Sequence, residues 1–362
     1  MADVELPGRL GDPTRTVGTD PRMDPRLLAT LAAYGLDTNG APPPLPPDAP
    51  VEQIIAFADA TENGFAGLFA AMFNGVPPVE GVTRETITTQ GGDGNEITLF
   101  VHRPASADGP LPGVYHIHGG GMVLLAAANP EYVWWRDRMA ATGLVVVGVE
   151  YRNGAGKLGP HPFPAGLRDC IAGLRYTLDH RDDLGISQVI VSGESGGGNL
   201  SLATSITANN EGWVDEISGV YAECPYISGA YADPPPELTS LHENDGYFLR
   251  CDLMALLVSA YDPGGENLRN PRAWPLNAST PDLAGFPPTV ISVNELDPLR
   301  DEGLQFLRNL WAAGVPARGR VTPGTTHAGD ILLGPVNAPE LTDATAEDLR
   351  AFAYAVAHNP AR

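Results

Sequence analysis

The segment QVIVSGESGGGNL, at residues 188–200, runs from a short apolar stretch into a glycine-rich corner that contains one serine, Ser195. Glycines stand two positions before and two positions after this serine. A sharp turn between a strand and a helix brings backbone segments close together, so the flanking positions have to be small. The pattern therefore predicts that Ser195 projects at a turn between a strand and a helix, whose N-terminus favours developing negative charge.

A glycine-rich corner can instead hold a phosphate, and this alternative needs different neighbours. A Walker loop needs a lysine after its second glycine, but the only lysine of the chain is Lys157. A dinucleotide-binding fingerprint needs a glycine where Ser195 stands. The corner therefore favours a serine nucleophile over a phosphate site.

A second glycine-rich motif, HGGG at residues 118–121, follows the apolar segment GVYHI. Glycines leave backbone N–H groups unshielded, and such a corner can direct two of them at an oxygen. We expect the amides of Gly120 and Gly121, together with that of Gly196, to form a three-donor oxyanion hole. The alternative is a flexible surface loop. His118 is expected to hold this loop by hydrogen bonding to backbone.

From residue 85 onward, strand-like and helix-like segments alternate, which predicts an α/β fold with a mostly parallel central sheet and helices on both faces. Residues 1–80 read differently, because two stretches with helical apolar spacing, 24–34 and 51–73, flank a proline-rich segment. We expect residues 1–80 to form the N-terminal part of a helical cap and residues 226–275 a cap insertion. Residues 81–225 and 276–362 would form the catalytic domain.

The chain of 362 residues carries 44 acidic and 22 basic residues, giving a formal charge of −22. No basic stripe is available to neutralise phosphates, so we expect no nucleic-acid partner. No apolar run approaches the roughly 20 residues that span a bilayer, and the first residues lack the pattern of a signal peptide. We therefore expect a cytoplasmic protein without membrane insertion, and its three dispersed cysteines are expected to stay reduced.

The motifs HGGGM (118–122), EYRN (150–153), HPFP (161–164), GESGGGNL (193–200) and NELDPLRDEG (294–303), together with a late histidine, resemble the hormone-sensitive-lipase-like carboxylesterases of the α/β-hydrolase fold. The resemblance covers roughly residues 80–362 and implies Ser195, Asp297 and His327 as a catalytic triad. Two departures stand out. Most relatives have Asp and Ala where this chain has Glu194 and Gly196, and the segment between EYR and HPFP is longer than usual.

The triad partners of the serine also follow from chain order. In α/β-hydrolases the base follows the last strand, which indicates His327, and the acid follows the strand before it, which favours Asp297. Asp301 stays an alternative acid, and helix N-capping is the non-catalytic alternative for either carboxylate. The remaining histidines are expected to be structural or at the surface: His102, His116, His118, His161, His180, His242 and His358.

These features predict a serine carboxylesterase that hydrolyses esters of small to medium apolar alcohols or acyl groups through an acyl-enzyme, without metal or cofactor. Its partner would be a small-molecule ester, and a homodimer is left open. A lactonase, amidase or peptidase with the same triad is one alternative. A non-catalytic small-molecule receptor of the same fold is another. We expect four residues to line the pocket, although each could equally be a core residue: Met122, Tyr247, Phe248 and Trp274.

Overall fold

A sheet of eight strands forms the centre of the protein, in the order β1-β2-β4-β3-β5-β6-β7-β8. The structure is a computed structural model that describes residues 6–357, so His358 lies outside the described residues. The strands β1 and β2 pair antiparallel with each other, as do β2 and β4, and all other neighbours are parallel. The strands are β1 Val82–Gln90, β2 Glu96–Pro104, β3 Leu111–Ile117, β4 Val145–Glu150, β5 Ile186–Glu194, β6 Gly219–Glu223, β7 Thr289–Asn294 and β8 Ala317–Thr322.

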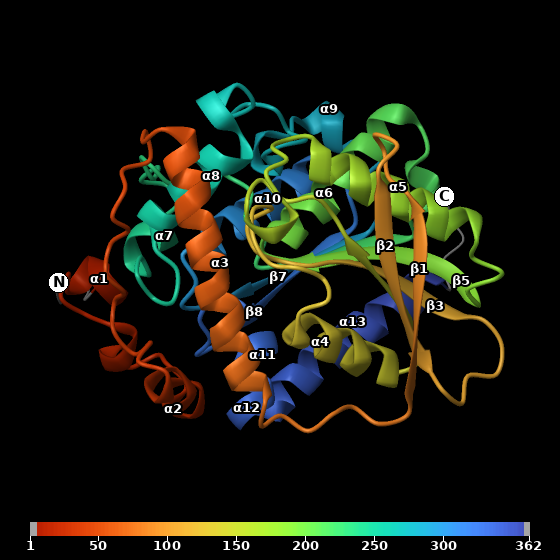
Figure 1. Ribbon diagram of the computed structural model, residues 1–362, viewed down its shortest axis with the longest axis horizontal. Coiled ribbons are helices and arrows are strands. Elements are labelled where there is room, and N and C mark those ends of the chain that lie inside the picture. Colours follow the sequence, from red (N-terminus) through yellow and green to blue (C-terminus); the bar gives the residue numbers. More distant parts are fainter. Residues whose placement is uncertain (1–5, 358–362) are drawn as a thin grey trace.

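Helices cover both faces of this sheet, which confirms the predicted α/β architecture (Figure 1). On one face lie α5 Ala165–Asp179, α6 Gly196–Glu211 and α10 Arg300–Ala312. On the other lie α4 Pro130–Ala141 and α13 Pro339–Ala357. The central strands β3 to β7 are almost wholly buried, because parallel strands covered on both faces have no solvent side.

A further group of helices lies to one side of the sheet, at the left of Figure 1. The long helix α3 Val51–Phe73 packs against α8 Cys251–Tyr261, although some two hundred residues separate them along the chain. The shorter helices of this group are α1 Gly8–Gly11, α2 Pro25–Ala33, α7 Ser240–Glu243, α11 Gly329–Leu332 and α12 Gly334–Asn337. The short helix α9 Thr280–Leu283 lies apart from them, beside α6 and α10 (Figure 1). The N-terminal segment and the segment after β6 thus meet over the same part of the molecule.

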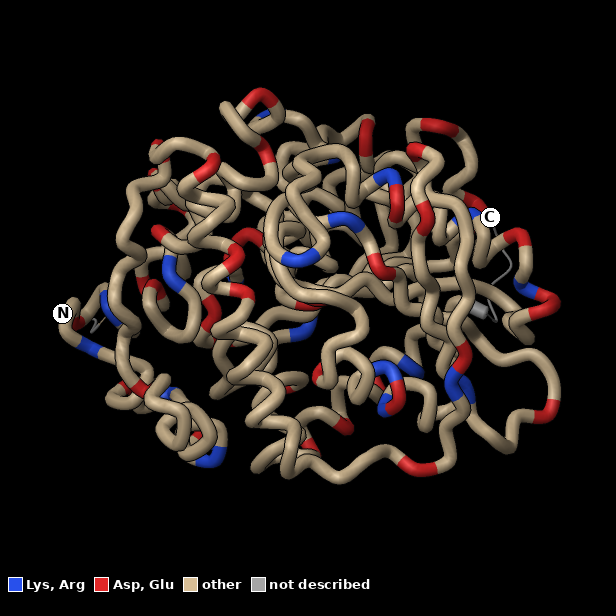
Figure 2. Tube along the Cα trace, in the orientation of Figure 1, with Lys and Arg blue, Asp and Glu red and all other residues tan. Residues whose placement is uncertain are grey.

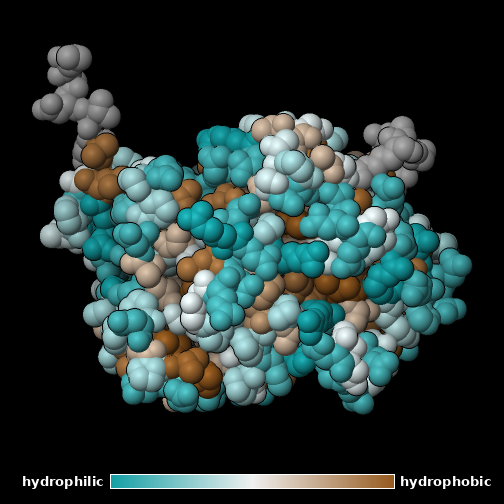
Figure 3. Space-filling model, turned by 90° about the horizontal axis from the view of Figure 1, so that it is seen from above, coloured by the Kyte–Doolittle hydropathy of each residue, from teal (hydrophilic) through white to brown (hydrophobic). Residues whose placement is uncertain are grey.

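The distribution of charged residues over the structure reflects the excess of acidic residues in the sequence (Figure 2). Figure 2 shows Lys and Arg scattered among more numerous acidic residues. The face in Figure 3 is mostly hydrophilic, with separate small hydrophobic areas.

None of the helices in residues 6–357 combines the length and apolar character needed to cross a membrane. All three cysteines, Cys170, Cys224 and Cys251, are buried and unpaired.

Candidate active site

Ser195 occupies the corner between β5 and α6, where the backbone leaves the strand and starts the helix. Its φ and ψ are 57° and −119°, values that L-residues adopt rarely and only when the surroundings enforce them. Its N–H donates to the Glu223 carbonyl at the end of β6, over 2.9 Å. Its own carbonyl accepts from the Asn199 N–H in α6 and the Tyr226 N–H after β6. These bonds hold Ser195 at the helix N-terminus in its strained conformation.

The glycines beside Ser195 are required by close backbone approach. A Cβ on Gly193 would lie 2.4 Å from the Ile117 carbonyl oxygen, and one on Gly197 would lie 1.9 Å from the same atom. Both distances are far below van der Waals contact, so no side chain fits at either position. The structure thus confirms that small residues at these two positions are a steric requirement of the turn.

Residues 119–125, which we call the glycine loop, follow β3 and lie against the start of α6. Gly120 and Gly121 have φ values of 99° and 63°, and a Cβ on Gly120 would meet the Leu124 carbonyl oxygen at 2.0 Å. A Cβ on Gly196 would lie only 2.7 Å from the Gly121 nitrogen, so the two backbones touch. Within residues 6–357, the amides of Gly120, Gly121 and Gly196 donate to no protein acceptor. They are therefore available to an oxygen of a bound molecule.

Glu194, the residue before the nucleophile corner, fixes the start of the glycine loop. Its side chain is 2% exposed and accepts from the Gly119 N–H over 2.8 Å. Its second oxygen lies 2.9 Å from His116 Nε2. Burial lowers the pKa of His116, so the ring is neutral and donates its Nε2 proton to Glu194. The sequence did not predict this role, because His116 on β3 and Gly119 just after it are 78 and 75 residues away in the chain.

His118 also acts within the protein. Its Nδ1 lies 2.8 Å from the Gly119 carbonyl, and its ring stacks on Tyr151 with 4.3 Å between centroids. The Tyr151 hydroxyl in turn donates to the His118 carbonyl over 2.9 Å. His118 therefore braces the backbone of the glycine loop, as expected from the sequence.

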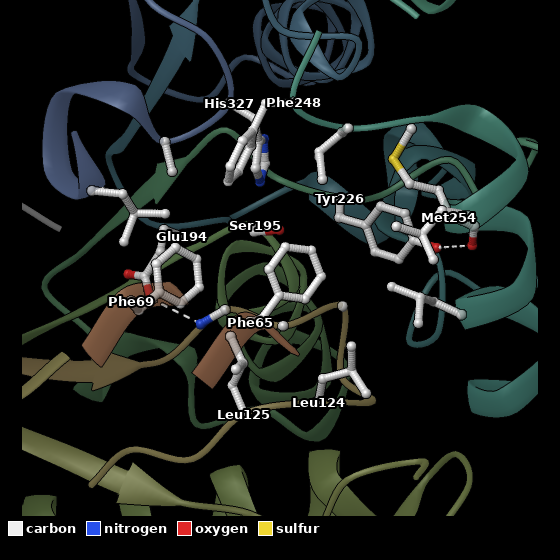
Figure 4. Close-up of a pocket in the computed structure, with 18 of the residues that line it drawn as sticks. Phe65, Phe69, Leu124, Leu125, Glu194, Ser195, Tyr226, Phe248, Met254 and His327 are labelled. Carbon is white, nitrogen blue, oxygen red and sulfur yellow. Dashed lines mark hydrogen bonds between the residues drawn. The ribbon is translucent and has the colours of Figure 1, made fainter. Parts of the chain in front are cut away.

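Asp297 and His327 form a hydrogen-bonded pair near Ser195. His327 Nδ1 lies 2.8 Å from Asp297 Oδ2, and both side chains are buried. The other carboxylate oxygen of Asp297 accepts from the Leu299 N–H over 2.9 Å. An acid held in this way orients the imidazole and leaves its Nε2 to face the cavity. Figure 4 shows His327 and Ser195 directed toward the same space.

The alternative acid, Asp301, faces away from His327. It accepts from the Ser240 N–H over 2.8 Å and pairs with Arg300. Glu295, two residues before Asp297, accepts from the Gly324 N–H. Of these three carboxylates, Asp297 is thus the one that contacts the histidine.

Asn294, at the end of β7, positions the segment that carries His327, a role with no sequence signal. Its Nδ2 donates to Thr325 and Asp330 side chains, and its Oδ1 accepts from the Ala328 N–H over 3.2 Å. Ala328 has a left-handed backbone conformation, with φ of 51°. One buried amide thus ties both sides of His327 to the sheet.

A cavity of about 700 Å³ of non-atom space, including its open mouth, lies between Ser195 and the helices α3 and α8 (Figure 4). Apart from Glu194, Ser195 and His327, its walls are apolar or aromatic side chains and the backbone of the glycine loop. The lining residues are Phe65, Phe69, Gly119, Gly120, Gly121, Leu124, Leu125, Tyr132, Glu194, Ser195, Tyr226, Phe248, Leu249, Leu253, Met254, Leu257, His327, Ala328 and Leu332.

Of the four residues expected to line the pocket, Phe248 does so. Met122, Tyr247 and Trp274 do not, and this corrects the expectation for these three. Trp274 is wholly buried and packs edge to face between Tyr226 and Tyr261. The Tyr247 hydroxyl donates to Asp20 in the N-terminal segment. The apolar or aromatic character of a residue was therefore not enough to predict whether it lines the cavity or lies in the core.

Cys224, Asp297 and His327 have potential metal-ligand atoms within 4.8 Å of one another. The Asp297 and His327 atoms already bond to each other. Burial raises the pKa of the Cys224 thiol well above its ordinary value, so the thiol stays protonated and is a poor ligand. The arrangement suits an acid–imidazole pair better than a metal site.

Comparison with known proteins adds to this geometry. A family model described as the α/β-hydrolase fold matches residues 114–330, more than half of the chain. The chain belongs to the α/β-hydrolase family. Among solved structures of this family, brefeldin A esterase, described as a bacterial homologue of human hormone-sensitive lipase, is 44% identical. The match covers 97% of this chain and 99% of that one, with a TM-score of 0.93. The predicted resemblance to the hormone-sensitive-lipase-like branch is confirmed.

Other α/β-hydrolases support the same placement. The structure of esterase Est22 is 35% identical, covers 94% of this chain and 99% of its own, and has a TM-score of 0.82. Carboxylesterase NlhH of Mycobacterium tuberculosis is 32% identical over 276 residues, which are 74% of this chain and 82% of that protein. These relatives extend across most of the length of the chain.

Proposed function

We propose that this α/β-hydrolase is a serine carboxylesterase that hydrolyses esters of small to medium apolar acids and alcohols. The observation that carries the proposal is the buried Asp297–His327 pair beside Ser195 in one apolar cavity. The carboxylesterase and esterase names of its relatives agree with this activity. Neither a metal nor a cofactor takes part in the proposed reaction.

In the proposed mechanism, Ser195 Oγ attacks the ester carbonyl while His327 Nε2 takes its proton. Asp297 holds the imidazole through Nδ1 and stabilises the imidazolium that forms. The amides of Gly120, Gly121 and Gly196 stabilise the oxyanion of the tetrahedral intermediate. The alcohol then leaves with the proton from His327, and water hydrolyses the acyl-enzyme by the same sequence of steps.

The cavity supports a neutral, apolar substrate. The one carboxylate in its lining, Glu194, already accepts from Gly119 and His116. No lysine or arginine is among the lining residues, so a substrate carboxylate would be desolvated without a partner. We propose that residues 1–80 and 226–275 act as the cap over this site. A cytoplasmic location and a homodimer remain predictions.

A panel of p-nitrophenyl esters of rising acyl length tests the proposal. We expect turnover of short and medium esters, and we expect Ser195→Ala to lower kcat by a factor on the order of 10⁶, as loss of a serine nucleophile does elsewhere. Ser187→Ala, at the exposed start of the same strand, is the matched control and should leave turnover unchanged. Undiminished hydrolysis by the Ser195 variant would refute the assignment.

A further inference from the structure

Buried carboxylates hold both ends of the glycine loop, residues 119–125. At its start, Glu194 accepts from the Gly119 N–H. At its end, Glu62 accepts from the Leu125 N–H over 3.0 Å. Glu62 belongs to α3, 63 residues earlier in the chain, and is 2% exposed. The matched family model, residues 114–330, does not include this helix.

The second oxygen of Glu62 joins a third segment to the same point. It accepts from the Lys157 N–H over 2.7 Å, in the segment between EYR and HPFP. A Cβ on Gly156 would lie 2.3 Å from this oxygen, so the approach depends on a glycine there. Glu62 therefore joins α3, the glycine loop and residues 153–159.

Residues 153–159 form a layer behind the glycine loop. The Gly154 N–H donates to the Met122 carbonyl over 2.9 Å, and the Ala155 N–H donates to the Val123 carbonyl over 3.1 Å. The buried side chain of Asn153 donates to the Leu125 carbonyl over 2.7 Å. Both backbone polar groups of Leu125 are thus occupied, one by Asn153 and one by Glu62.

The glycine loop needs such support because its conformation is strained. Met122 and Leu125 have φ values of 61° and 71°, although neither is glycine. Residues in this region persist there only when surrounding contacts fix them. Between them and β3 lie Gly120 and Gly121, whose amides we assign to the oxyanion. If the bond at Leu125 is lost, the loop can relax and shift these amides.

We propose that Glu62 is a positioning residue for the oxyanion hole. It is not among the residues that line the cavity, so it would act on a bound substrate only through the glycine loop. It fixes the far end of the glycine loop, so that the seating of helix α3 determines the direction of the Gly120 and Gly121 amides. This inference rests on the proposed esterase function and assigns to α3 a role in the chemical step in addition to lining the pocket.

Glu62→Gln tests the inference with little change in shape. Glutamine keeps one acceptor oxygen but turns an NH₂ group toward the second N–H. We expect kcat for a p-nitrophenyl ester to fall about tenfold, less than the 10²–10³ lost when an oxyanion donor is removed, with little change in KM. Glu52→Gln, at an exposed position of the same helix, is the matched control and should match the wild type.

A trifluoromethyl ketone separates positioning from general stability. Ser195 Oγ adds to its carbonyl, the proton passes to His327, and the new oxyanion occupies the hole. We expect the affinity of Glu62→Gln for this ketone to fall in parallel with kcat/KM, while binding of the corresponding alcohol, which has no oxyanion, is unchanged. Equal losses for both ligands, or a rise in KM with kcat unchanged, would overturn the proposal.

Hydrogen exchange measures the loop independently of activity. In Glu62→Gln the amides of residues 119–125 should exchange faster than in the wild type, while those of α6 stay protected. Unchanged exchange in the loop, in a folded variant with wild-type kcat, would show that Glu62 has no positioning role. If instead the wild type hydrolyses no ester, the proposed function fails, and the exchange result still decides whether Glu62 holds the loop. Glu62→Ala should show the larger effect, and the glutamine variant decides the question if the alanine variant does not fold.

Discussion

Replacing Glu194 tests how the glycine loop is held at its start. In Glu194→Ala, the buried Gly119 N–H and His116 Nε2–H both lose their acceptor. A buried polar group without a partner costs about 1–3 kcal/mol, so the free energy of unfolding should fall by about 2–6 kcal/mol. Because Gly119 precedes the two amides assigned to the oxyanion, kcat should fall about 10²-fold.

Glu194→Gln gives a smaller effect that can be worked out from the same contacts. Its amide oxygen can still accept from Gly119, but its NH₂ group then faces His116 Nε2. The imidazole can accept this bond only by moving its proton to Nδ1, which has no partner within the described residues. One unpaired buried donor corresponds to a loss of about 1–3 kcal/mol, with less than tenfold loss of kcat because the loop stays anchored.

Chemical denaturation and steady-state kinetics on both variants measure these effects. Glu96→Gln, at an exposed position at the start of β2, is the control for loss of a negative charge. The reasoning is refuted if Glu194→Ala keeps the wild-type kcat, or if the alanine variant is no less stable than the glutamine variant. The first result would mean that Gly119 does not set the position of the next two amides.

Three further predictions concern the acid, the corner and pH. Asp297→Asn should lower kcat about 10⁴-fold and Asp301→Asn less than tenfold; the reverse order in steady-state kinetics would overturn our assignment. Gly196→Ala places a Cβ 2.7 Å from the Gly121 nitrogen, so kcat should fall about 10–100-fold with little change in KM. A wild-type kcat would show instead that the glycine loop moves to accommodate the methyl group. Burial raises the pKa of Glu302 from 4.5 to about 7, so the stability it contributes is complete below pH 4.5 and is lost as pH rises to about 7. As the pH rises across this window, the free energy of unfolding of Glu302→Gln should therefore increase by up to about 3 kcal/mol relative to that of the wild type. A difference that does not change with pH in denaturation experiments would contradict the raised pKa of Glu302.

Most elements of the fold could be predicted from sequence because their apolar spacing follows a single period. Helix α4 does not follow such a period. Its buried face includes charged residues that break the helical pattern. Arg136 donates to His102 Nε2 over 3.0 Å, and Asp137 lies 2.8 Å from the other nitrogen of that ring. These charges are stable inside because other segments supply partners: His102 on β2 and Arg84 on β1 for Asp137, and the Ala127 carbonyl before α4 for Arg136. Spacing along α4 cannot reveal these partners.

Some active-site residues could likewise be predicted from the local sequence, whereas the role of others depends on the tertiary structure. Ser195 and its flanking glycines follow from local sterics, since a sharp strand-to-helix turn excludes side chains whatever surrounds it. The sequence favours Asp297 but keeps Asp301 as an alternative, because Asp301 stands only four positions later and both follow β7. Only the direction of each side chain, toward His327 or toward Ser240, decides between them.

The sequence by itself determined the alternating α/β order, the serine corner and the glycine motif, because each depends on residues close together in the chain. The tertiary structure decided what depends on distant segments. It placed Phe65 and Phe69 of α3 in the cavity, left Trp274 in the core, and brought Glu62 and Glu194 to opposite ends of the glycine loop. A buried carboxylate is stable only where folding brings N–H donors to it, and no local pattern encodes that meeting.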